Sequence, residues 1–207
     1  MTEAQRAVVD IDGYVIFFKQ FHLFLSVSLF MLVTGIDLIN SNLAGIILGI
    51  YPLLGYCYFM LKSRKYFSKV KNHKRNMLIA VVILGITIFF SGKLFYEGFS
   101  ENKIVLGKND LEITGMYGEK INRKEIVNMQ LVNSLPEISM RSNGFSAGDF
   151  RKGYFKTKDR KTVKLFVNKK ENPLLLLNTT KGVIYFSSSE KPAQNLFKEI
   201  EAWRGFN

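Results

Sequence analysis

Three long apolar stretches occupy most of the first 96 residues, and no such stretch follows them. They run from about residue 21 to 39, from 43 to 61 and from 77 to 96. A bilayer core about 30 Å thick needs roughly 20 helical residues. The third stretch meets that length if Lys93 extends its ammonium to the interface. A buried helix of a soluble protein would carry a polar stripe, which these stretches lack. We therefore predict a helical membrane domain in residues 1–98 with three transmembrane helices.

The segment between the second and third stretches, residues 62–76, is strongly basic and contains no acidic residue. Short loops rich in lysine and arginine stay on the cytoplasmic side. With three spans, residues 99–207 then lie on the outer side of the membrane; with one span fewer, they lie inside. The basic side chains of this segment are the expected contacts with anionic lipid headgroups: Lys62, Arg64, Lys65, Lys69, Lys71, Lys74 and Arg75.

The net charge of +12 would also suit a nucleic-acid-binding protein, but the regional distribution argues against that class. Residues 1–98 carry 10 basic and 5 acidic side chains, and residues 99–207 carry 19 and 12. Seven of the first ten basic residues lie in the single loop 62–76. We therefore expect the bilayer, and no nucleic acid, as a partner.

Residues 99–207 alternate short strand-like runs with turns. Apolar and polar side chains alternate at residues 111–114 and 127–131, which is typical of half-buried strands. Residues 174–177 are all leucine, as in a strand buried on both faces. About seven short antiparallel strands, spaced for a small barrel or sandwich, are predicted.

The chain ends in a predicted amphipathic helix. Pro192 suits a first helical turn, and the apolar side chains that follow share one helical face. We expect this face to cover the open end of the barrel: Ala193, Leu196, Phe197, Ile200 and Trp203.

Residues 134–153 are predicted to be the least regular part of this domain, with Asn143-Gly144 as a turn. An irregular, glycine-containing segment is a candidate loop for binding a partner protein. Its candidate residues are Arg141, Asn143, Gly144, Phe145 and Gly148.

No residue pattern indicates catalysis, a cofactor or a metal. Cys57 is the only cysteine, and His22 and His73 lie away from other candidate ligands, whereas a metal site needs three or four converging ones. Phosphate-binding glycine loops and the Gly-x-Ser-x-Gly motif are missing from the sequence. Asp37 is the single acid within an apolar stretch, and its place near the predicted end favours an interfacial role. We expect no enzyme.

Several short motifs in residues 103–203 resemble a bacterial pleckstrin-homology-like family that forms the terminal domain of small membrane proteins. They are the stretch 113–121 (ITGMYGEKI), the pairs Glu125-Ile126 and Leu135-Pro136, the segment 141–148 (RSNGFSAG), residues 152–155 (KGYF), 163–167 (VKLFV), Pro173 and 185–188 (YFSS). The resemblance implies a pleckstrin-homology-like barrel of about seven antiparallel strands, capped by the C-terminal helix. The family carries no assigned catalytic residues.

The resemblance also bears on the ligand. Many eukaryotic relatives of this fold bind phosphoinositides through a basic loop between their first two strands. Here that loop, residues 107–110 (GKND), holds one lysine and one acid, which argues against inositol lipids.

The sequence thus predicts a membrane-anchored, non-enzymatic interaction module that binds a protein or peptide partner at the membrane surface. Two alternatives stay open. One is a regulatory subunit or small transporter-associated protein, in which the helices are the active part. The other is a sensor of anionic lipid headgroups that uses the basic residues between 151 and 170.

Overall fold

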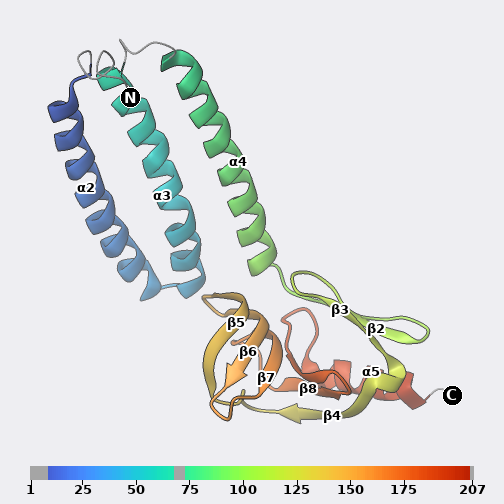
Figure 1. The fold of residues 1–207 in the computed structure, drawn as a ribbon. Helices are drawn as coiled ribbons and strands as arrows, with labels where there is room; N and C mark the ends of the chain where they lie inside the picture. The colour runs from blue at the N-terminus through green and yellow to red at the C-terminus, as the bar shows by residue number, and fades with distance from the viewer. Residues whose placement is uncertain (1–8, 68–72, 206–207) are drawn as a thin grey trace. The chain divides into compact units, whose positions relative to one another are not determined.

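The computed structural model describes residues 9–67 and 73–205, which fold as two compact units, Met1–Phe95 and Tyr96–Asn207. The first unit is helical and the second is rich in strands (Figure 1). The predicted domain border, between residues 98 and 99, lies three residues further along the chain.

The first unit contains α2 (Ile11–Asp37), α3 (Ser41–Ser63), the short 3-10 helix η1 (Arg64–Phe67) and most of α4 (His73–Phe99). All three long helices are apolar and long enough to cross a membrane. Helix α2 begins ten residues before the predicted span. Its start is fixed by a cap, because the Asp10 carboxylate accepts a hydrogen bond from the Gly13 amide (2.9 Å). The apolar pattern marks the membrane-compatible part of a helix and not its first turns.

Helices α2 and α3 are joined by a tight turn and pack against each other. Asn40 caps α3 by accepting from the Leu43 amide (3.1 Å), so the polar residues after it begin α3 rather than fill the turn. The aromatic rings of Phe17 and Phe59 stack with centroids 5.3 Å apart. The hydroxyl of Tyr51 donates to Ser28 (2.8 Å) across the same interface.

The second unit is built from two sheets. β1 (Ile104–Leu106), β2 (Asp110–Ile113) and β3 (Glu119–Asn122) form an antiparallel sheet in that order. After the one-turn helix η2 (Arg123–Glu125), six strands form a mixed sheet in the order β4-β8-β9-β7-β6-β5. These strands are β4 (Ile126–Val132), β5 (Ile138–Ala147), β6 (Phe150–Thr157), β7 (Thr162–Asn168), β8 (Leu174–Thr179) and β9 (Gly182–Phe186). Helix α5 (Ala193–Gly205) follows.

The predicted closed barrel of about seven antiparallel strands is therefore wrong in detail. The described residues hold nine strands in two open sheets, and β9 pairs with β7 in parallel. The parallel pair arises because β9 inserts between β7 and β8, two strands that precede it in the chain. Residue periodicity reports which face of a strand is buried, but not which strand lies beside it.

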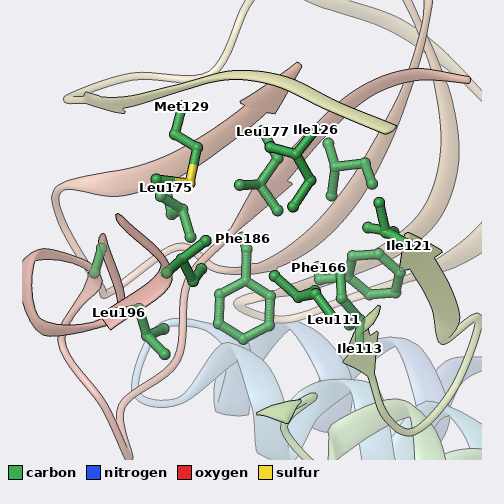
Figure 2. Packing of buried hydrophobic residues seen from close by; sticks show 13 residues of the cluster. Leu111, Ile113, Ile121, Ile126, Met129, Phe166, Leu175, Leu177, Phe186 and Leu196 are labelled. Atoms are coloured by element: carbon green, nitrogen blue, oxygen red, sulfur yellow. The ribbon is translucent and has the colours of Figure 1, made fainter. Parts of the chain in front are cut away.

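The main core lies between the two sheets and α5 (Figure 2). Phe166 and Phe186 of the large sheet, Leu111 of the small sheet and Ile200 of α5 are all 1% exposed or less. The predicted apolar face of α5 is confirmed, because its buried members contact this core. A second cluster, which includes Leu165 and Leu174, covers the other face of the large sheet. Strands β7 and β8 are therefore buried on both faces, as the all-leucine run 174–177 predicts.

Candidate functional site

Strand β5 and the start of β6 occupy most of the segment predicted to be irregular, and that prediction is wrong. Asn143 and Gly144 pair with Tyr154 and Gly153 of β6, and the turn falls at residues 148–149 instead. Gly144 allows the two strands to approach closely, since a Cβ on it would lie 2.4 Å from the carbonyl oxygen of Lys152. The Asn-Gly pair thus serves a close backbone contact inside a hairpin.

The five predicted partner-binding residues come together on one hairpin arm. Arg141, Asn143, Gly144 and Phe145 lie on β5, and Gly148 lies in the turn that leads to β6. Arg141 and Asn143 are exposed, whereas Phe145 is half-buried.

Strand β5 is an edge strand, since in the described residues its only ladder partner is β6. Two bulges, at Ser139 and Ser142, interrupt its first half. Both serine hydroxyls donate to β6 carbonyl oxygens, for example Ser142 to Tyr154 (3.1 Å). The second half, residues 143–147, pairs without a break and carries no charge. This half, called the β5 edge below, offers a short regular strand for main-chain pairing.

Lys152 extends from β6 into a buried polar cluster at the start of the second unit. Its side chain is 1% exposed, and its ammonium donates to the carbonyl oxygens of Glu97 (3.2 Å) and Ser100. These carbonyls lie at the C-terminal end of a helix, where the dipole favours a cation. Burial lowers the pKa of Lys152 to about 8, against the opposing effect of Glu101.

Glu101 anchors the other half of this cluster. Its carboxylate accepts from the Asn168 amide (2.9 Å), the Ser188 hydroxyl (2.7 Å) and the Ser189 backbone amide (2.8 Å). Burial favours the neutral acid, but these hydrogen bonds outweigh that effect and hold the pKa of Glu101 below its ordinary value. The cluster ties residues 97–101 to β6, β7 and the segment before α5.

The β5 edge borders on this cluster. Phe145 pairs with Lys152 across the hairpin, and its ring meets that of Phe99 edge-on, with centroids 5.3 Å apart. Phe99 also contacts Phe150. A ligand on the β5 edge would therefore be separated from the end of α4 by the side chain of Phe145 alone.

A cavity of about 230 Å³ lies between β3 and the β7–β9 pair. Lys164 lines it with a side chain that is only 8% exposed, paired with Glu119 at 3.0 Å and placed over the Tyr154 ring. Lys181, also in the lining, is paired with Glu125 at 2.7 Å. Both cations are neutralised by acids, so the cavity offers no free positive charge to an anionic headgroup.

The basic segment before α4 is exposed where the structure describes it. Lys62 lies in the last turn of α3, Arg64 and Lys65 in η1, and Lys74 and Arg75 in the first turn of α4. Lys69 and Lys71 lie outside the described residues. The ammonium of Lys65 lies 4.7 Å from the centroid of the Tyr66 ring, a pairing that suits a membrane interface.

Of the residues singled out for possible chemistry, His22 has a structural contact and Asp37 lies at a helix end. His22 forms a hydrogen bond with the Tyr56 hydroxyl (3.2 Å) between α2 and α3. Asp37 is exposed at the last position of α2, the helix-end position that the sequence favours. Within residues 9–67 and 73–205, no three histidine, cysteine, aspartate or glutamate side chains gather as a metal site would require.

The buried lysines are the main features that sequence reasoning missed. Lys152 and Lys164 belong to a dense basic run between residues 151 and 170, which reads as solvated strand faces. Each lysine pairs with an aromatic residue across the β6–β7 ladder, Lys152 with Phe166 and Lys164 with Tyr154, and such a cross-strand neighbour cannot be identified from the sequence.

Comparison with known proteins assigns the second unit. The family described as "Bacterial PH domain" matches residues 102–200. No curated protein and no solved structure matches the chain. Domains of the pleckstrin-homology type are in general non-catalytic. Residues 102–200 of this chain match the bacterial PH domain family, and they follow a helical N-terminal region with three candidate transmembrane helices.

Proposed function

We propose that this protein is a membrane-anchored, non-enzymatic interaction module in which the β5 edge binds an extended segment of a partner protein. The partner adds a strand beside β5, as in other cases of strand addition. The three helices hold the PH domain at the outer surface of a bacterial cytoplasmic membrane. Arg141, at the border of the β5 edge, selects an acidic or polar side chain on the partner.

The observation that carries this proposal is the regular, uncharged half of β5 at an open sheet edge. Natural proteins usually protect such edges with bulges or charges. Here both bulges fall before residue 143, so residues 143–147 keep the regular strand geometry that a backbone ladder needs. Three of the five predicted partner-binding residues, Asn143, Gly144 and Phe145, lie on this part of the chain, and Arg141 and Gly148 flank it.

Photo-crosslinking in native membranes tests the proposal on the full chain. In one variant of the chain, an amino acid with a benzophenone side chain replaces Asn143, which is exposed on β5. In a second variant it replaces Lys198, which is exposed on α5. We expect a discrete adduct from position 143 and none of the same mass from position 198. The same adduct from both positions would indicate collision and would contradict the proposal.

A matched pair of substitutions then separates strand addition from side-chain contact. Lysine on an edge strand disfavours pairing, so Ser146→Lys should reduce the adduct from position 143 about tenfold, and Ser146→Thr should preserve it. In hydrogen exchange, the amides of residues 143–147 should gain protection when the crosslinked partner segment is added as a peptide. An adduct insensitive to Ser146→Lys would exclude main-chain pairing at this edge.

A further inference from the structure

Strand β4 forms the opposite edge of the large sheet, with one bulge between Ile126 and Asn128 where β5 has two. Arg204 of α5 donates to the carbonyl oxygen of Ile126 (2.9 Å) at its first residue, and the rest of the strand follows without a break. It pairs only with β8 among the described strands, and its register from residue 128 to 132 is unbroken. None of its seven residues is charged and none is proline. Val127 and Leu131 are 64% and 39% exposed. An uncharged apolar edge of this kind favours pairing with another strand.

The sequence of β4 is chemically symmetric about its central residue, Met129. Reading outward in both directions gives an amide residue, an aliphatic residue and a second aliphatic residue. The strand reads Ile-Val-Asn-Met-Gln-Leu-Val. In an antiparallel pair of identical strands centred on Met129, Asn128 faces Gln130 of the second copy and Val127 faces its Leu131. Every side chain then meets one of its own chemical kind, as an interface with two-fold symmetry requires.

We propose that two copies of this chain pair through β4, antiparallel and centred on Met129, to form one sheet across both PH domains. This surface is distinct from the β5 edge, so a dimer would still present two β5 edges to partners. The interaction does not depend on the proposed function and can fail or hold separately from it.

Charge makes a second copy the favoured occupant of this edge. Residues 99–207 carry 19 basic and 12 acidic side chains, so two copies repel each other over most of their surfaces. The β4 edge is a strip where identical domains can approach without placing like charges face to face. A heterologous partner would be expected to use acidic groups against this basic domain. The seven residues of β4 provide no cation to receive them, and Arg204, at the start of the strand, already donates to the Ile126 carbonyl oxygen.

One backbone amide of β4 forms a local hydrogen bond with a side chain, as is common on a strand edge that has no neighbouring strand. The backbone amide of Met129 donates to the side-chain oxygen of the adjacent Asn128 (2.7 Å). Such local bonds satisfy an amide where ladder acceptors are missing. In the proposed dimer, the Met129 amide exchanges this side chain for a backbone carbonyl at the two-fold axis.

Disulfide mapping in native membranes tests the register. Two differently tagged full-length chains, both with Cys57→Ser, are co-expressed, one with Asn128→Cys and the other with Gln130→Cys. Facing residues in an antiparallel pair are about 5 Å apart at Cβ, within reach of a disulfide, whereas diagonal residues are about 7–8 Å apart. We expect a disulfide that joins both tags under mild oxidation. Two Asn128→Cys chains should yield at least about tenfold less.

Charges introduced at the same two positions give an independent test that needs no cysteine. When both tagged chains carry Asn128→Lys and Gln130→Lys, each lysine faces a lysine of the other copy, and co-purification of the two chains should fall about tenfold. When both chains carry Asn128→Lys and Gln130→Glu instead, each lysine faces a glutamate of the other copy, and co-purification should return to the level of the unsubstituted chains. The proposal is overturned if mixed and matched cysteine pairs crosslink equally, if no disulfide joins the tags, or if both charge variants co-purify alike. Trp203 emission confirms that each variant remains folded.

Discussion

Two lysines in the PH domain are buried in different ways, and the difference has measurable consequences. Lys152 is held by backbone carbonyl oxygens, which carry only partial charge, and so its ammonium is poorly compensated. Lys164 has a full countercharge in Glu119. Titration should therefore be most informative at Lys152, and loss of a partner most informative at Lys164.

Removal of the Lys152 charge should change how stability depends on pH. The pKa of this side chain is about 8 in the folded chain and 10.5 ordinarily. Between these values the unfolded chain binds more protons, so this group adds stability as the pH rises, by at most about 1.4 kcal/mol per pH unit. We expect the unfolding midpoint of the wild type to rise relative to that of Lys152→Met between pH 7.5 and 9.5.

Trp203, the only tryptophan, provides the signal for this measurement in detergent. Its indole donates to the Gly107 carbonyl (2.7 Å), so its emission reports on the fold of the PH domain. Lys169, whose pKa burial also lowers, is present in both proteins, and its contribution cancels in the comparison. Parallel pH profiles for the two proteins would contradict an uncompensated Lys152.

Glu119→Gln should destabilise the PH domain at pH 7.5 because it leaves the Lys164 ammonium buried without a countercharge. A loss of about 1–3 kcal/mol is expected. Glu112→Gln is the matched control. Glu112 forms an ion pair with Lys120 (3.3 Å), both side chains are exposed, and such a pair contributes less than about 1 kcal/mol. Equal losses in urea unfolding, followed by Trp203 emission, would mean that the Lys164 ion pair is no more important than a surface one.

At the scale of single elements, the chain shows which patterns can be read from sequence. Helix α5 is predictable because its apolar side chains recur at a helical period and face one core. Strand β8 is predictable because an uninterrupted apolar run suits a strand buried on both faces. Strand β5 was missed because Asn143-Gly144 has the composition of a turn, while its true role depends on a close approach to β6.

Ile200→Ala tests the contribution of α5 to the core. Ile200 is fully buried against strands of both sheets, so its truncation should cost about 2–5 kcal/mol of unfolding free energy. Glu201→Ala changes the exposed adjacent residue and should stay within about 0.5 kcal/mol of the wild type. Similar losses in both variants, measured by Trp203 emission, would show that the helix does not cover the core.

At the scale of the whole molecule, the division into a helical region and a PH domain could be predicted from composition and motif order. Three apolar segments and the basic residues between the second and third were sufficient for the first part. The pairing of the strands could not be predicted, because a short strand carries no signal that identifies its neighbour. The same limit applies to the candidate site, where residues were identified but their place on a sheet edge was not.

The orientation of the chain gives a direct prediction. In a Cys57→Ser background, an impermeant maleimide should label Lys198→Cys in intact spheroplasts, and Arg75→Cys only after permeabilisation. The physical reason is the retention of the basic segment in the cytoplasm together with an odd number of spans. Labelling of both positions before permeabilisation, or of Arg75→Cys alone, would contradict a PH domain on the outer side.

The position of β9 in the large sheet has a consequence for biosynthesis. A ribosome releases β4 to β8 before β9, yet β9 is the strand that joins β8 to β7. Until residue 186 emerges, the large sheet can form only as two separate parts, β4-β8 and β7-β6-β5, each with an unpaired inner edge. Unpaired strand edges favour aggregation, so depletion of chaperones on the side where the domain folds should lower its yield more than that of the helical region alone.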